Sequence, residues 1–168
     1  FHRTYCELGV DAIETNTFGS FSIPLGEYGM ADRDIEISRA NAAIARRVAD
    51  EYGVFVAGSI GPGTKFASLG QITYDELRAA YRRQAQGLLE GGVDLLLIET
   101  QFDLLGCKAA MAGCRDAMAD AGRDVPIQLQ VTIELTGRML PGTEIQAALA
   151  ALEPLGPDVI GINCATGP

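Results

Sequence analysis

The stretch "GGVDLLLIETQF" (residues 91–102) shows how this chain is built. It opens with paired glycines, which can end a helix through a left-handed residue, and runs through apolar residues 95–98 to the polar Glu99 and Thr100. A short, unbroken apolar run between turn signals is typical of a parallel strand that is covered on both faces. The stretch therefore predicts a helix end, a turn and a buried strand that finishes on polar side chains.

The same pattern occurs near the start of the chain and again at its end. "GVDAIETNTF" (residues 9–18) and "GPDVIGINCATGP" (residues 156–168) also open with glycine, a turn residue and Asp, and also end in polar residues. In α/β folds the carboxyl ends of parallel strands carry the functional site. We therefore expect the polar endings of all three stretches, which include Glu14, Asn16, Thr17, Glu99, Asn163 and Cys164, at one edge of a sheet.

Two further stretches, "VFVAGSI" (residues 54–60) and "PIQLQVTI" (residues 126–133), have the β-branched residues and flanking turn signals of strands. Helical periodicity fills the intervals between the strands. Residues 34–52 carry one apolar stripe that we expect to pack on the sheet. That stripe consists of Ile37, Ala40, Ile44 and Val48.

Capping residues mark where several of these helices begin. Thr73 followed by Glu76 has the spacing of a capping box, and Asp103 is a suitable N-cap for the next helix. Thr143 followed by Gln146 repeats the capping-box spacing. We expect a helix to start after each of these caps.

The alternation of strands and helices predicts an α/β fold. Strand starts are spaced by roughly 30 to 45 residues, as in a (β/α)8 TIM barrel, and a whole barrel takes about 250 residues. We expect the 168 residues to form a single domain without an internal linker, an incomplete barrel of about strands 2 to 6 and their helices. A smaller, doubly wound sheet also satisfies the alternation.

Composition excludes several classes of function. The chain is 48% hydrophobic and 21% charged, which is ordinary for a globular domain. A net charge of -9 argues against binding to nucleic acid or to anionic membranes. No apolar run approaches the roughly 20 residues that span a bilayer, and no signal peptide is evident, so we expect a cytoplasmic protein.

The cysteines fall into two groups. Cys107 and Cys114 lie seven residues apart in a predicted helix, and we interpret them, like Cys6, as helix packing. Cys164 follows a strand, where a cysteine suits a metal ligand or a nucleophile; the alternative is a small buried hydrophobic residue.

Glu14 and Glu99 are carboxylates at strand ends, and a carboxylate placed there needs a cation or backbone donors. An Arg or Lys from a neighbouring loop is one candidate partner for each, and the ammonium group of a substrate is the other. The sequence pattern alone does not decide between them.

Several motifs together resemble one family along essentially the whole chain. "IETNTFGS", "VAGSIGPGTK", "GRMLPGTEIQAAL" and "GINCATGP" occur in the order found in the homocysteine S-methyltransferase family. Within that family they are most similar to the homocysteine-binding, zinc-containing barrel of cobalamin-dependent methionine synthases.

The resemblance implies an activity and a cofactor set. In the family, three cysteines hold zinc, and Cys164 matches the first of them; the other two form an adjacent pair in a later motif that this sequence does not contain. Zinc favours the thiolate of homocysteine, which takes the methyl group of methylcobalamin to give methionine. Other domains of the parent protein bind the cobalamin and recharge it from 5-methyltetrahydrofolate.

The resemblance also assigns substrate contacts. Glu99 matches the carboxylate that receives the amino group of homocysteine, and Asn16, Thr17 and Asn163 are further candidates for the substrate site. Betaine or S-methylmethionine as methyl donor is an alternative, and so is an inactive barrel fragment that acts only by association. We expect the 168 residues alone to be inactive and to self-associate.

Overall fold

The computed structural model describes residues 1–165, which form one parallel sheet and its helices. The strands are β1 (Ala12–Glu14), β2 (Phe55–Ile60), β3 (Leu95–Gln101), β4 (Ile127–Val131) and β5 (Val159–Ile162). The α-helices are α1 (His2–Cys6), α2 (Ser22–Gly26), α3 (Asp34–Tyr52), α4 (Tyr74–Glu90), α5 (Leu104–Ala121) and α6 (Ile145–Leu152). Short 3-10 helices occupy Ala31–Arg33, Ala67–Leu69 and Glu153–Leu155.

The strand order distinguishes between the two predicted architectures. The sheet runs β1-β2-β3-β4-β5, so each strand pairs with its neighbour in the chain, and every pairing is parallel. A doubly wound sheet reverses its strand order at a switch point, whereas a (β/α)8 barrel keeps the chain order throughout. The described residues follow the barrel order.

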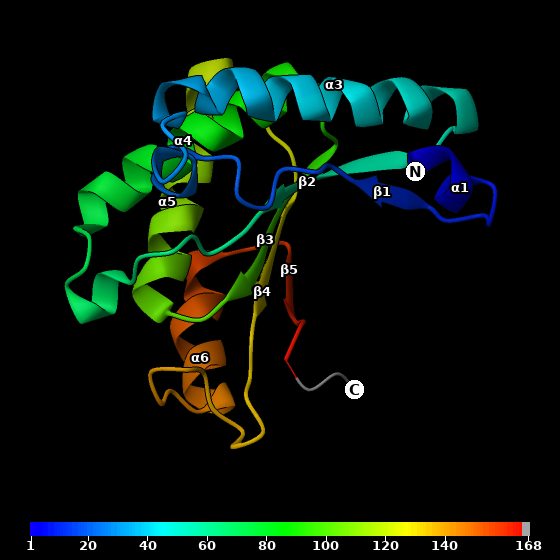
Figure 1. Cartoon of the computed structure of the whole chain (residues 1–168). Helices are drawn as coiled ribbons and strands as arrows, with labels where there is room; N and C mark the ends of the chain where they lie inside the picture. The colour runs from blue at the N-terminus through cyan, green and yellow to red at the C-terminus, as the bar shows by residue number, and fades with distance from the viewer. Residues whose placement is uncertain (166–168) are drawn as a thin grey trace.

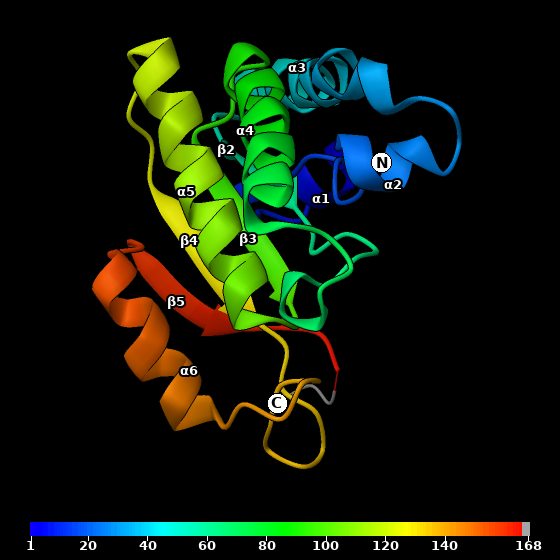
Figure 2. The same ribbon diagram turned by 90° about the vertical axis from the view of Figure 1, so that its left-hand side faces the viewer.

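Helices cover only one face of the sheet in the described part of the chain (Figure 1), and the view turned by 90° shows α4 and α5 in front of the strands (Figure 2). The side chains that point toward the helices are fully buried; they include Val56, Ile60, Leu96, Ile98 and Leu129. The opposite, inner face carries Glu14, Ser59, Leu97 and Glu99, because side chains alternate along a strand. Helices therefore cover one face of each strand, and the second face is the inner surface of a barrel-type sheet.

A helix begins after each of the three predicted caps, but only two of the caps are confirmed. Thr73 and Glu76 form a reciprocal capping box on α4, and the Asp103 side chain accepts a hydrogen bond from the backbone N–H of Leu105. Thr143 caps nothing: the N-cap of α6 is Glu144, without a side-chain hydrogen bond. The backbone oxygen of Thr143 instead accepts a hydrogen bond from the Met139 N–H at 2.8 Å, within a loop of residues 134–144 that backbone hydrogen bonds fold back on itself.

The apolar stripe predicted for α3 is also wrong. Ile44 is 45% exposed, whereas the buried face of this helix carries small residues, namely Ser38, Ala42, Ala45 and Ala49. The cause is the close approach of α4: a Cβ added at Gly87 would lie 2.6 Å from the backbone oxygen of Ile35. Small residues, not large apolar ones, therefore mark the packed face.

The same close packing occurs between α4 and α5 at Gly113, and it predicts the outcome of a substitution. A Cβ at Gly113 would lie 2.6 Å from the backbone oxygen of Arg78 and 2.8 Å from the backbone nitrogen of Arg82. We expect Gly113→Ala to destabilise the fold by about 1–3 kcal/mol, the usual range for overpacking. Thermal unfolding measures the loss.

Gly106→Ala is the matched control, because Gly106 lies in the same helix and a Cβ there would make only an ordinary contact, 3.5 Å from the Gln101 side-chain oxygen. Alanine is a better helix former than glycine by about 0.5–1 kcal/mol, so this variant should be neutral or stabilised. Equal destabilisation of both variants would contradict the packing argument.

No helix within residues 1–165 is long and apolar enough to cross a membrane.

Within residues 1–165 the two edge strands of the sheet, β1 and β5, leave backbone groups without a partner strand. Within the same residues β1 and β5 each pair on one side only, and Val159 and Ile162 of β5 are 50% and 59% exposed. Unpaired edges with apolar side chains invite pairing between chains.

We therefore expect the isolated 168-residue chain to elute as oligomers in size exclusion with light scattering. Lysine on an edge strand opposes such pairing, so Val159→Lys with Ile162→Lys should shift the chain toward monomer. Leu69→Lys replaces an equally exposed leucine away from both edges and should leave the oligomers unchanged. A monomeric parent chain would contradict the prediction.

Candidate substrate and metal site

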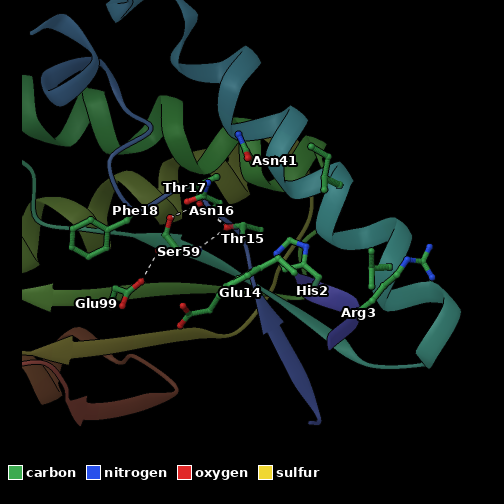
Figure 3. Close-up of a pocket in the computed structure, with 13 residues that line it drawn as sticks. His2, Arg3, Glu14, Thr15, Asn16, Thr17, Phe18, Asn41, Ser59 and Glu99 are labelled. Atoms are coloured by element: carbon green, nitrogen blue, oxygen red, sulfur yellow. Dashed lines mark hydrogen bonds between the residues drawn. The ribbon is translucent and has the colours of Figure 1, made fainter. Parts of the chain in front are cut away.

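A cavity of about 730 Å³ opens at the carboxyl ends of β1, β2 and β3. Its walls come from α1, from β1 and the loop that follows it, from α3, and from Ser59 and Glu99 on the neighbouring strands (Figure 3). Because parallel strands end at one edge, the polar endings predicted for the first two repeated stretches meet here. The cavity is therefore the first candidate for a ligand site.

Glu99 is oriented by two neutral donors. The Ser59 hydroxyl donates to its Oε1 at 2.5 Å, and the Asn163 side-chain amide donates to its Oε2 at 3.3 Å. Neither Glu99 nor Glu14 takes part in any ion pair within residues 1–165. The described residues therefore contradict the alternative of an internal Arg or Lys partner. A fixed carboxylate without a counter-ion is suited to binding a cation from solution.

Asn163 ties the end of β5 to the end of β3. Its Oδ1 accepts a hydrogen bond from the Thr100 backbone N–H at 2.8 Å, and its amide donates to the Thr100 hydroxyl at 2.9 Å. Thr100 has a φ of 57°, in the left-handed region that β-branched residues rarely adopt, and the register with β4 shifts between Ile98 and Gln101. The Asn163 side chain thus stabilises a strained bulge next to Glu99.

Cys164 differs from the other cysteines in its surroundings. Its side chain is exposed, its φ is 63°, and it follows directly after Asn163. Cys107 and Cys114 are buried in α5, and burial raises the pKa of each thiol to about 12. The prediction of a packing role is confirmed for these two and for the buried Cys6, whereas Cys164 is not the small buried residue of the alternative reading.

The described residues do not bring a complete set of zinc ligands to this edge. Within residues 1–165, no cluster of three or more His, Cys, Asp or Glu side chains is arranged to hold a metal ion. Cys164 fits zinc as a soft donor because its sulfur is exposed where β5 ends.

Asn16 and Thr17 both line the cavity, but in different states. Asn16 is exposed, and its side chain makes no hydrogen bond among residues 1–165. Thr17 is buried, its hydroxyl donates to the Ser59 backbone oxygen at 2.7 Å, and it lies 2.5 Å from the Thr15 hydroxyl. Thr17 thus holds the cavity wall in place, while Asn16 is available to a ligand. Asn163 and Cys164 lie outside this cavity, and Asn163 is connected to it through Glu99.

Sequence reasoning missed two residues that build the site. Ser59 orients Glu99, and Gln84 of α4, fully buried, donates from its amide to the Thr17 backbone oxygen at 2.7 Å. For Gln84 the sequence does hold a signal, because a glutamine on the apolar stripe of a helix needs a polar partner inside the protein. Ser59 carries no such signal, since serine is common in strand endings.

Comparison with known proteins places this geometry in a family. Residues 1–168 match the family model described as homocysteine S-methyltransferase. The chain belongs to the homocysteine S-methyltransferase family. This confirms the resemblance drawn from the motifs.

Two methionine synthases are close relatives. The chain is 55% identical over 172 residues to the methionine synthase of Mycobacterium tuberculosis (strain ATCC 25618 / H37Rv), and 53% identical to that of Mycobacterium leprae (strain TN). In each comparison the match covers 99% of this chain and 14% of the relative. The chain thus spans about one seventh of the length of these proteins.

Solved structures share the fold. The metallated form of the homocysteine methyltransferase MmuM from Escherichia coli matches with a TM-score of 0.79 and 20% identity, over 97% of this chain and 61% of that one. A 2,3-dimethylmalate lyase of the PEP mutase/isocitrate lyase superfamily matches with a TM-score of 0.59 and 19% identity, over 96% and 52%. With the strand order, these similarities confirm the prediction of an incomplete (β/α)8 barrel.

Proposed function

We propose that this chain is the part of a methionine synthase that binds homocysteine and presents its thiol for methylation. The observation that carries the proposal is Glu99, a carboxylate fixed by Ser59 and Asn163, without an ion-pair partner among residues 1–165, in a family that acts on an amino acid thiol. Identity of 55% to a methionine synthase supports this assignment over free-standing methyltransferases, to which the likeness is one of fold alone.

Glu99 receives the ammonium group of homocysteine in this proposal. Each of its oxygens already accepts one hydrogen bond and keeps a lone pair for a further donor. Hydrogen bonds between an ammonium group and a carboxylate are about twice as strong as neutral ones. Asn16, exposed in the same cavity, is available to the polar end of the substrate. Thr17 contributes indirectly, because its hydrogen bond to Ser59 holds the cavity wall in place.

Cys164 contributes one of the zinc ligands, and the adjacent cysteine pair implied by the family resemblance supplies the others. When bound, zinc lowers the pKa of the substrate thiol from about 8.5, which makes the nucleophilic thiolate available at neutral pH. Asn163 links the two ends of the site, because its backbone precedes Cys164 and its side chain bonds Glu99. The sulfur and amino ends of the substrate are thereby held at a fixed separation.

The methyl donor in this proposal is methylcobalamin, bound by another domain of the parent protein and recharged from 5-methyltetrahydrofolate on a further one. The rest of the length of the methionine synthases, of which this chain spans 14%, can accommodate such domains. We place the parent protein in the cytoplasm. A parent protein without cobalamin or folate domains would point to betaine or S-methylmethionine instead.

Substitution of Cys164 tests the metal assignment. In the parent protein, Cys164→Ser should lose zinc and homocysteine methylation together, because a hydroxyl is a poor ligand for a soft metal site. Metal analysis of the purified variant measures the loss. Cys107→Ser and Cys114→Ser are the matched controls, since both thiols are buried in α5, and they should retain zinc. Full zinc content in the Cys164 variant would remove it from the metal site.

Substitution of Glu99 tests the substrate assignment. Glu99→Gln keeps the shape of the side chain but removes its charge, and a lost charge-assisted hydrogen bond costs about 1.5–3 kcal/mol, roughly a ten-fold to hundred-fold weaker Kd for homocysteine. Zinc content should not change. Glu153→Gln, an exposed site in the 3-10 helix before β5, is the control at the opposite end of the sheet. An unchanged Kd in the Glu99 variant would refute the assignment.

A further inference from the structure

Glu14 is a second carboxylate at the cavity, and the proposed function gives it no role. It ends β1, faces the inner side of the sheet and lines the same cavity as Glu99 (Figure 3). Both oxygens of Glu99 accept hydrogen bonds, whereas no side-chain hydrogen bond or ion pair reaches Glu14 among residues 1–165. One carboxylate is thus fixed in place, and the other is without a partner.

The other charged groups at the cavity do not neutralise this pair. α1 contributes His2 and Arg3 to the cavity wall. The Arg3 guanidinium forms an ion pair with Glu51, in which its Nη2 donates to Oε1 at 2.6 Å. Neither His2 nor Arg3 forms an ion pair with Glu14. The remaining walls carry uncharged side chains, which include Asn41, Ile44 and Val48 of α3 and Ser59 of β2. Partial burial raises the pKa of Glu14, and so does the negative charge of Glu99. The cavity therefore holds excess negative charge.

We propose that Glu14 is a specificity-determining residue that binds the ammonium group of the substrate together with Glu99. The inference rests on the proposed function and extends it. An ammonium group has three N–H donors, so the fixed Glu99 carboxylate and the unpartnered Glu14 can both accept from it. A cation between the two carboxylates also removes the repulsion between them, which is a gain that only a cationic ligand brings.

The positions of the strands give this arrangement a direction. Cys164 follows β5, Glu99 lies on β3 and Glu14 ends β1. In the sheet one strand separates β5 from β3, and one strand separates β3 from β1. The sulfur end of a bound amino acid thiol lies toward β5, and its amino end lies between β3 and β1. A ligand without a cationic amino group leaves the two carboxylates unpaired and repelling each other. The site therefore binds such a ligand more weakly than an amino acid thiol.

The proton balance of binding follows from the same geometry. In the free protein the pKa of Glu14 is raised, and a bound ammonium group lowers it, because an opposite charge favours the ionised carboxylate. Binding of homocysteine therefore releases a proton wherever free Glu14 is partly protonated. The contribution of Glu14 to the affinity rises with pH through the pKa of free Glu14 and levels off above it, whereas proton release from the substrate thiol acts at higher pH.

The test compares two ligands of the parent protein by calorimetry: homocysteine and 4-mercaptobutyrate, which is the same thiol acid without the amino group. We expect Glu14→Gln to weaken homocysteine binding about ten-fold or more, since it removes a charge partner. Binding of 4-mercaptobutyrate should stay the same or improve, zinc content should not change, and the acid-side pH dependence of homocysteine affinity should flatten.

Asp11→Asn is the matched control, because Asp11 directly precedes β1 but does not line the cavity. It should leave the affinities for both ligands unchanged. Glu14→Asp keeps the charge on a shorter side chain and should retain part of the preference for homocysteine, which provides a second measurement if Glu14→Gln does not fold.

The possible outcomes separate the inference from the proposed function. Loss of homocysteine affinity in Glu99→Gln but not in Glu14→Gln would overturn the role of Glu14 and leave the proposed function intact. Equal weakening of both ligands by Glu14→Gln would also overturn it, because that result indicates a merely structural residue. Unchanged affinity in both Glu variants would refute the proposed function itself.

Discussion

The hydrogen-bonded side chain of Asn163 is the interaction on which the site depends. It connects the end of β5 to the end of β3, although β4 lies between these two strands in the sheet. It accepts a hydrogen bond from the Thr100 backbone N–H and donates to the Thr100 hydroxyl and to Glu99. A threonine with φ of 57° costs conformational energy, of order 1–3 kcal/mol for such strained residues, and persists where its surroundings stabilise it. The strained residue directly follows Glu99, where the register of β3 against β4 shifts, so a side chain at the end of β5 stabilises the end of β3.

The helix layer provides the rigidity that this arrangement requires. α3, α4 and α5 pack closely because glycines and alanines line their contacts, and a Cβ at Gly87 or Gly113 would collide with the backbone of the neighbouring helix. α4 in turn contributes Gln84, whose side-chain amide donates a hydrogen bond to the Thr17 backbone oxygen in the loop after β1. Packing and polar positioning thus act through the same helix, and a shift of α4 would move the cavity wall.

The parts of the fold that depend on local pattern were predictable from sequence. The three repeated stretches placed Glu14, Glu99 and Asn163 at strand ends, and the caps at Thr73 and Asp103 follow from residue type and spacing alone. The buried face of α3 was not predictable, because the contact with α4 selects small residues and leaves the large apolar ones to other surroundings.

The sequence predicted which residues belong to the site but not how they contact one another. That Asn163 contacts Glu99 depends on the position of strands far apart in the chain, and the bulge at Thr100 has no signature in residue type. Ser59 is likewise an ordinary strand serine until the register of β2 against β3 places its hydroxyl beside a carboxylate. Such contacts are long-range, so they follow from the assembled sheet and not from any single stretch.

The choice of neutral donors around Glu99 is what gives the site its chemistry. Asp34 shows the alternative within the same chain: its buried carboxylate is paired with Arg83 at 2.5 Å, so its charge is neutralised internally and acts in packing. Serine and asparagine also orient Glu99, but they leave its charge uncompensated. A carboxylate that is oriented yet not neutralised binds an external cation without first breaking an ion pair. A fixed position together with an unpaired charge distinguishes Glu99 from the ion-paired Asp34 in this chain.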